Sequence, residues 1–174
     1  YSSTASATTT LGTPDAPTSL TPSSVSTTSL TLSWTDASSN EDSFIVKYGT
    51  DGSTYPTTVT TTAANVSTTG GSSLTPNTLY YFIVVASNGS GTATSTAVST
   101  TTLAAVPTDF TASAVSTSQI NLSWSSTNPS GSVYEIRDSG DTLIATTTVT
   151  SYSVTGLSEN TSYTYKVRTQ QTGD

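Results

Sequence analysis

Apolar and polar residues alternate along much of the chain, and this period of two predicts β-strands. Leu30, Leu32 and Trp34 alternate with polar residues, so the three apolar side chains would share one face of a strand. The pattern returns over residues 44–48, and clusters of Pro, Gly, Asn and Asp between such runs indicate turns. No stretch follows the helical period of 3.6. The sequence therefore predicts an all-β fold.

The alternating pattern occurs twice. Trp34 and Trp124 are 90 residues apart, and Ile120, Leu122 and Trp124 repeat the alternation of the first copy. Such self-similarity indicates a repeated folding unit. We expect two domains, residues 15–104 and 105–174, joined by a short extended linker around "LAAVP" and preceded by residues 1–12.

A third motif carries a family resemblance. The first copy reads "LTPNTLYYFIVVASNGSG" from Leu74, and the second reads "LSENTSYTYKVRTQQTGD" from Leu157. Both resemble the corner before strand F, and strand F itself, of a fibronectin type III domain. The resemblance implies two tandem immunoglobulin-like β-sandwiches in which the hydroxyls of Tyr80 and Tyr163 bond back across the corner. The second copy departs from the family at Glu159, where Pro is usual.

The second copy does not include the last strand that the resemblance implies. A domain of this family has strands A to G, and residues 92–103 would be strand G of the first copy, whereas the second copy reaches Asp174 before its own strand G. Residues 1–11 resemble residues 93–103 instead. Seven of the eleven aligned positions are identical: Ser3, Thr4, Ala5, Thr8, Thr9, Thr10 and Leu11 match Ser95, Thr96, Ala97, Thr100, Thr101, Thr102 and Leu103.

We therefore expect residues 1–12 to act as strand G for a neighbouring unit. The donor would be Ser3, Thr4, Ala5, Ser6, Ala7, Thr8, Thr9, Thr10 and Leu11, with Ala5, Ala7 and Leu11 on one face; the acceptor would be strand F of the second copy, about residues 161–171, through Tyr163, Tyr165, Val167 and Thr169. An unpaired strand edge recruits another strand.

The spacing agrees with this expectation. If Asp174 met Tyr1 of another copy, Tyr163 would be followed by Leu11 after 22 residues, against 23 from Tyr80 to Leu103. The same contact would arise inside a longer covalent array cut at an exposed loop. The two alternatives differ in whether Asp174 is bonded to the next Tyr1.

Composition narrows the functional classes. The net charge is −7 with only four basic residues, which argues against binding to a nucleic-acid backbone. The chain has no His and no Cys, and G-x-S-x-G is absent, so we expect no enzymatic activity, no catalytic residues and no cofactor. It has no apolar run of membrane-spanning length. We expect an extracellular or cell-surface location.

Two groups of polar residues have more than one interpretation. Asp36, Asn40, Glu41 and Asp42 could offer oxygen ligands to calcium, but such residues more often cap their own turn, so no metal is expected. Asp138 and Asp141 would form a hairpin turn around Gly140. Candidate N-glycosylation sites are Asn65, Asn88, Asn121 and Asn160, although a chain so rich in Ser and Thr produces such sequons by chance.

The outer face of the first copy is unusually apolar. Ile45, Tyr81, Ile83 and Val85 would point outward, whereas the second copy has Thr164, Lys166 and Arg168 at the matching positions of strand F. This outer patch is a candidate contact surface.

The function that we expect is structural: a subunit or repeat of an extracellular filament that assembles head to tail with copies of itself. Cell-surface glycans and other surface proteins are further candidate partners. The alternative is a spacer or a carbohydrate or adhesion module of a larger secreted enzyme or adhesin, for which Tyr55 and Tyr81 are the candidate exposed aromatic residues.

Overall fold

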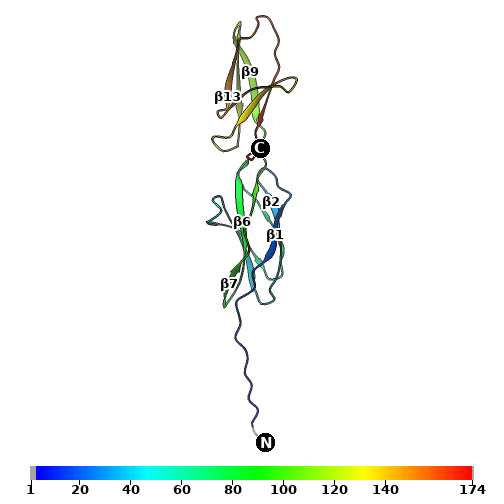
Figure 1. The fold of residues 1–174 in the computed structure, drawn as a ribbon, viewed down its shortest axis with the longest axis vertical. Coiled ribbons are helices and arrows are strands. Elements are labelled where there is room, and N and C mark those ends of the chain that lie inside the picture. Colours follow the sequence, from blue (N-terminus) through cyan, green and yellow to red (C-terminus); the bar gives the residue numbers. More distant parts are fainter. Residues whose placement is uncertain (1–2, 174) are drawn as a thin grey trace. The chain divides into compact units, whose positions relative to one another are not determined.

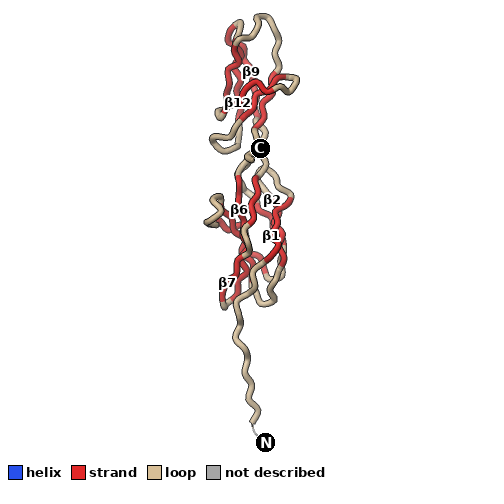
Figure 2. The backbone as a smooth tube through the Cα atoms, viewed as in Figure 1, coloured by secondary structure: helices blue, strands red, loops and turns tan. Residues whose placement is uncertain are grey.

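Two β-sandwiches follow one another along the chain in the computed structural model, which describes residues 3–173 (Figure 1). Figure 2 shows strands and loops throughout. Among the described residues there is no helix long and apolar enough to cross a membrane. By its contacts the chain divides into two compact units, and Val25–Ser29 and Ser72–Leu79 are grouped with the second unit. The predicted all-β fold with two sandwiches is confirmed.

The first sandwich consists of a three-stranded and a five-stranded sheet. One sheet has the order β1-β2-β5, and the other has the order β4-β3-β6-β7 with β8 also paired to β6. The strands are β1 (Thr18–Ser23), β2 (Leu30–Thr35), β3 (Ser43–Gly49), β4 (Thr57–Ala63), β5 (Thr68–Gly71), β6 (Leu79–Asn88), β7 (Gly91–Thr94) and β8 (Val98–Thr101).

The predicted alternation of β2 forms the centre of the first core. Leu30, Leu32 and Trp34 are all buried. The ring of Trp34 meets that of Phe44 edge to face, with the ring centroids 5.6 Å apart. Such aromatic pairs contribute about 1 kcal/mol beyond the area that they bury. The interpretation of these residues as one buried face is confirmed.

The last strand of the first sandwich is interrupted. We expected one strand over residues 92–103, but β7 and β8 are separated by Ser95–Ala97. At the break the Val84 N–H donates to the hydroxyl of Ser95 over 3.0 Å, in place of a backbone carbonyl. The backbone N–H of Ser95 still donates to the Val84 carbonyl over 2.9 Å. A side chain therefore replaces one backbone bond, and the strand shifts its pairing there.

The second sandwich has two three-stranded sheets. Their orders are β13-β10-β9 and β12-β11-β14. The strands are β9 (Thr108–Ser116), β10 (Gln119–Ser125), β11 (Tyr134–Asp138), β12 (Leu143–Thr147), β13 (Ser151–Thr155) and β14 (Tyr165–Thr169). The expected strand at residues 161–171 was too long. In the first sandwich β8 pairs with β6. In the second sandwich no described strand lies at the matching place beside residues 161–164.

The core of the second sandwich is less well covered than that of the first. Its buried members are Leu122, Trp124, Tyr134, Ile136 and Val154. The inward residues of strand F are buried in the first sandwich, at Tyr80, Phe82 and Val84. The matching residues of the second sandwich are only half-buried: Tyr163, Tyr165 and Val167.

Candidate strand-addition site

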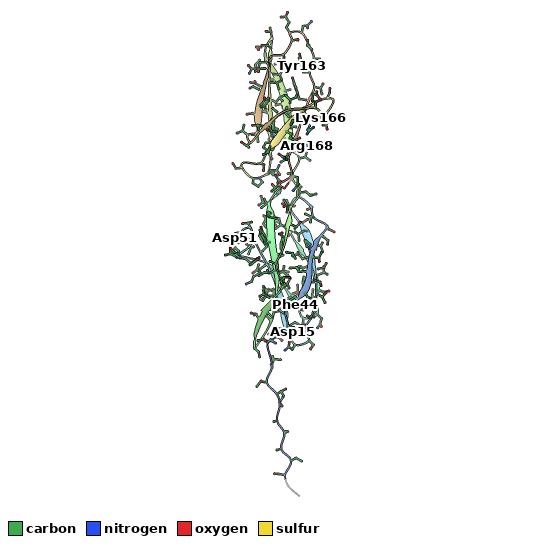
Figure 3. All side chains as sticks on the ribbon, viewed as in Figure 1. Asp15, Phe44, Asp51, Tyr163, Lys166 and Arg168 are labelled. Carbon is green, nitrogen blue, oxygen red and sulfur yellow. The ribbon has the colours of Figure 1, made fainter. Side chains whose placement is uncertain are left out.

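The outer edge of β14 is open. Among the described residues β14 pairs only with β11, in a register that places Val167 opposite Ile136. In the first sandwich β7 and β8 pair with the corresponding edge of β6, the edge that faces away from β3. Three of the expected acceptor residues, Tyr165, Val167 and Thr169, lie on β14, and Tyr163 lies in the segment before it (Figure 3).

The inner face of β9 is uncovered next to this open edge. Ala112 and Ala114 pair with Leu122 and Ile120, so they share the core-facing side of their sheet, yet both are exposed. Phe110 is half-buried, whereas its counterpart Leu20 in the first sandwich is buried. The apolar interior of the second sandwich therefore reaches solvent on the side where a seventh strand would lie.

A hollow of about 450 Å³ lies at this opening. It is lined by Ala114, Ile120, Leu157 and Tyr163 together with polar residues of the neighbouring turns. A second hollow, of about 430 Å³, shares Leu157 and Tyr163 but reaches Ile144 on β12 and Val154 on β13, away from the open edge of β14. The first hollow lies where an added strand could cover apolar side chains.

The corner before β14 has the expected tyrosine bond. The Ser158 N–H donates to the hydroxyl of Tyr163 over 3.0 Å. The hydroxyl of Thr161 donates to the Glu159 carbonyl, as the hydroxyl of Thr78 donates to the Pro76 carbonyl in the first sandwich. Replacement of Pro by Glu at position 159 thus leaves the corner geometry intact.

Tyr165 carries a buried hydroxyl that has no hydrogen-bond partner within the described part of the chain. Its ring stacks on that of Tyr163, with the planes 9° apart. Burial, with a smaller contribution from Tyr163, raises the pKa of Tyr165 above its ordinary value. The first sandwich has Phe82 at this position, so the unpaired hydroxyl is specific to the open sandwich.

The expected donor segment is unpaired. Residues 3–11 are exposed, form no strand and extend from the first sandwich (Figures 1 and 3). Residues 1 and 2 of the expected donor lie outside the described residues. The segment from Ser3 to Thr10 therefore has its backbone available for pairing.

The base of this segment is held by the first sandwich. The carbonyl of Gly12 accepts from the side-chain amides of Asn40, over 3.0 Å, and Asn88, over 2.9 Å. The carbonyl of Leu11 accepts from the hydroxyl of Ser90 over 2.7 Å. The extension thus starts at a fixed point on the first sandwich. These roles of Asn40 and Asn88 were not predicted from the sequence.

In the loop considered as a calcium site, Asp36, Ser38 and Asn40 bond one another, whereas a buried oxygen of Glu41 has no partner among the described residues. A carboxylate oxygen of Asp36 accepts from the Ser38 N–H over 3.0 Å, and the Ser38 hydroxyl donates to the side-chain carbonyl of Asn40 over 2.7 Å. Within residues 3–173 no group of three His, Cys, Asp or Glu side chains is arranged to hold a metal ion. These bonds are those of a self-capped turn.

The turn between β11 and β12 follows the predicted hairpin. A carboxylate oxygen of Asp138 accepts from the Thr142 N–H over 2.8 Å, and this bond lowers the pKa of Asp138. Asp141 has a φ of 70°, a conformation that Asp tolerates better than most residues.

A buried carboxylate nearby was not anticipated. Glu135 is only 7% exposed, and one of its oxygens accepts from Nε of Arg137 and Nε of Arg168, over 2.8 and 2.7 Å. The bond from Arg168, followed by that from Arg137, lowers the pKa of Glu135. Two of the chain's four basic residues therefore neutralise one acidic residue on the outer face of the second sandwich.

The four candidate glycosylation sites differ in accessibility. Asn65 and Asn160 are exposed in turns with positive φ, and Asn121 is exposed on β10. The amide nitrogen of Asn88 already donates to the carbonyls of Gly12 and Asn40. Asn88 is thus the least suited of the four to carry a sugar.

The outer patch of the first sandwich is partly covered. Ile45, Tyr81 and Ile83 are half-buried, and Val85 is only 8% exposed. Val85 was expected to belong to a candidate contact surface, but its burial leaves it little accessible area there. That residue lies between Ile45 on β3 and Thr94 on β7, so its cross-strand neighbours shield it.

Asn128 ties the linker to the second sandwich. Its side chain accepts from the Ala105 N–H and donates to the Ala105 carbonyl, both over 2.8 Å. The hydroxyl of Thr169 donates to the same carbonyl over 2.9 Å. The side chain of this expected acceptor residue is already engaged, and only its backbone can serve an added strand. No sequence pattern distinguishes Asn128 from the other loop asparagines.

Comparisons with known proteins agree with this architecture. A family model described as "Fibronectin type III domain" matches residues 15–102 and 105–174. The chain is similar to a solved segment of two fibronectin type III domains from chicken tenascin, with a TM-score of 0.70 and 18% identity, over 91% of this chain and 93% of that one. It is also similar to the FN1–FN3 domains of chicken CNTN1, with a TM-score of 0.44 and 24% identity, over 91% of this chain and 62% of that one. No curated protein sequence matches the chain.

Proposed function

The chain belongs to the fibronectin type III family, and we propose that it is a subunit or repeat of an extracellular fibre whose units join by strand addition. Residues 1–12 of one unit would lie along the free edge of β14 in the next unit, as its strand G. One observation supports the proposal most directly. The same chain has an open strand edge on its second sandwich and an unpaired extension whose sequence matches β7–β8 of the first.

The energetics favour such a contact. Each ladder hydrogen bond contributes about 1 kcal/mol net, so a strand held by about five bonds would gain on the order of 5 kcal/mol. Covering Phe110, Tyr165 and Val167, all half-buried in the free chain, would add an apolar contribution. These gains oppose the entropy lost when two chains associate and the extension becomes ordered, so the apolar coverage is needed in addition to the backbone pairing.

The geometry of the contact favours a chain of units. The donor and the acceptor are different surfaces of the same molecule, so the contact is heterologous and propagates unless its rotation closes a ring. Each unit that accepts a strand still offers its own extension. The fibre would therefore be polar, with a donor end and an acceptor end that could each add a further unit.

Purified chain tests the proposal. We expect concentration-dependent oligomers in sedimentation velocity and fibres in negative-stain images. A variant lacking residues 1–11 should stay monomeric and keep the circular dichroism of two sandwiches, because the described part of this segment pairs with no strand of its own chain. Oligomers of equal size from that variant would overturn the proposal.

The mass of the native material separates the two covalent arrangements. Denatured fibres that release 17.8 kDa subunits indicate noncovalent strand addition between chains. Release of one much longer chain indicates a tandem repeat in which the same strand pairing occurs between successive domains.

The rival function is a spacer or a carbohydrate-binding or adhesion module of a larger secreted protein. One observation favours it: Tyr55 and Tyr81, both half-buried rather than fully exposed, lie next to Gly52. The hydroxyl of Tyr55 donates to the Gly52 carbonyl over 3.1 Å, and a Cβ at Gly52 would lie 3.2 Å from the ring of Tyr81. Glycan-array binding that is lost in Tyr81→Ala, from a chain that stays monomeric, would favour the rival.

A further inference from the structure

Strand G of the first sandwich is held by two buried polar residues. Ser95 is 7% exposed and Thr102 is fully buried. Ser95 exchanges bonds with Val84: its backbone N–H donates to the Val84 carbonyl, and its hydroxyl accepts from the Val84 N–H. Ser95 directly follows β7, and Thr102 directly follows β8.

Thr102 makes the second set of bonds, at the corner before β6. Its hydroxyl donates to the Thr75 carbonyl over 2.7 Å and accepts from the Thr78 N–H over 3.0 Å. Its backbone N–H donates to the Thr78 carbonyl, also over 3.0 Å. A residue without a hydroxyl at this position would remove both of these part-buried side-chain bonds.

The side chains between the two anchors contribute little apolar burial. Ala97 and Ser99 are exposed, and Leu103 is 50% exposed. Val98 and Thr100 are half-buried and face the same way as Thr102. The position of strand G along strand F is therefore set by the hydroxyl groups of Ser95 and Thr102. A row of large apolar side chains does not set it.

The extension carries the same two anchors at the same spacing. Ser3 and Thr10 align with Ser95 and Thr102 and are identical to them. The acceptor supplies the matching backbone positions: Val167 corresponds to Val84, and Ser158 and Thr161 correspond to Thr75 and Thr78. The corner that presents Ser158 and Thr161 has the geometry of the first sandwich, with Asn160 and Asn77 both near a φ of 50°.

We propose that Ser3 and Thr10 fix the register of strand addition, Ser3 by exchanging backbone and hydroxyl bonds with Val167, and Thr10 by bonding Ser158 and Thr161 at the corner. This inference rests on the proposed function and names the contacts that give it specificity. A one-residue slip would remove both hydroxyls from their partners and turn the strand over.

In this register the donor would bury a different face from the one expected. Sequence reasoning placed Ala5, Ala7 and Leu11 on the contact face. Their counterparts Ala97, Ser99 and Leu103 are exposed in the first sandwich. The buried side of the added strand is therefore Ser6, Thr8 and Thr10.

Hydroxyl deletions in the full-length chain test the assignment. Ser3→Ala and Thr10→Val should each weaken the association constant from sedimentation equilibrium about tenfold, because each removes hydrogen bonds to groups that become buried. Thr4→Val is the matched control, because it makes the same chemical change at a position whose counterpart, Thr96, is exposed. Its association constant should stay within about twofold of the original.

The outcomes separate the two proposals. All three substitutions lie in a segment without strand pairing in the free chain, so circular dichroism should show unaltered sandwiches. If the original chain associates and the Ser3 and Thr10 variants associate equally well, the register assignment is wrong while strand addition stands. If the original chain does not associate at any concentration, strand addition between separate chains fails.

Discussion

Thr102 combines complete burial with a polar side chain, and its hydroxyl serves two backbone groups of the corner. Thr102→Val keeps the shape of the side chain and removes these bonds. The Thr75 carbonyl and the Thr78 N–H would lose this partner, so we expect the unfolding free energy of the first sandwich to fall by about 2 kcal/mol. Urea denaturation followed by tryptophan fluorescence in a Trp124→Phe background, in which Trp34 is the remaining tryptophan, measures the change.

The control for this substitution is Thr96→Val, which removes a hydroxyl from an exposed position of the same segment. It should change the unfolding free energy by no more than about 0.5 kcal/mol. Equal losses from both variants would show that the effect of Thr102→Val is one of strand propensity and not of hydrogen bonding.

Glu135 makes the stability of the second sandwich depend on pH in the acid range. Its pKa is lowered from an ordinary value of 4.5, because Arg168 and Arg137 bond the ionised form. A carboxylate whose pKa is lowered by folding stabilises the fold above its unfolded pKa, and this stability is lost as the pH falls through the folded pKa. We therefore expect the second sandwich to lose stability as the pH falls below about 4.5.

Glu135→Gln tests this assignment. At pH 7 the substitution should cost on the order of 1 kcal/mol, since Arg168 is largely exposed and solvent weakens its pairing. It should also flatten the fall in melting temperature between pH 5 and about pH 3. Glu159→Gln, at an exposed position in the same sandwich, should leave that slope unchanged. An unchanged slope in Glu135→Gln would assign the acid sensitivity elsewhere, with Asp138 the next candidate.

Strand F, which is β6 in the first sandwich and β14 in the second, differs between the two sandwiches. β6 spans Leu79–Asn88, whereas β14 spans only Tyr165–Thr169. We expect amide hydrogens of Thr161–Thr164 to exchange much faster in the monomer than those of Leu79–Phe82, because they belong to no strand. On assembly, protection should extend back to residue 161.

Hydrogen exchange followed by mass spectrometry on the monomer and on fibres makes this comparison. β6 provides the internal reference, since its neighbours β7 and β8 belong to the same chain. Equal protection of residues 161–164 in both states would show that no strand is added beside them.

Sequence patterns predicted the strands best where burial alternates. The runs at Leu30–Trp34 and Phe44–Val46 have one fully buried face, so hydrophobic period and structure agree. The limits of β14 and the break in strand G were not predictable in the same way. Both depend on hydrogen bonds to a neighbouring strand, and a period of two contains no information on which neighbour is present.

The candidate site was predictable only in outline. The open edge followed from comparison of the two copies. The anchoring roles of Ser95 and Thr102 did not, because Ser and Thr are so frequent in this chain that neither residue stands out. The same is true of Asn128 and of Glu135, whose partners come from segments that are distant in the sequence.

The outer patch of the first sandwich is a candidate surface for lateral contacts between fibres. Ile83 lies opposite Lys47 on β3 and is half-buried. Ile83→Glu would place opposite charges across the strand pair, so the fold should be kept while the apolar surface is interrupted. We expect monomer melting to change by only a few degrees and bundling of fibres to be lost, because apolar patches of this kind mark contact surfaces.

The measurement is electron microscopy of fibres together with thermal unfolding of the monomer. Leu143→Glu is the control, since Leu143 is an exposed apolar residue of the second sandwich outside the patch. Single fibres that persist in Ile83→Glu but no longer bundle would assign the patch to lateral contacts and the open edge to growth along the fibre. Bundles that are unchanged in Ile83→Glu would remove the patch from assembly, because a buried charge in a lateral contact costs several kcal/mol.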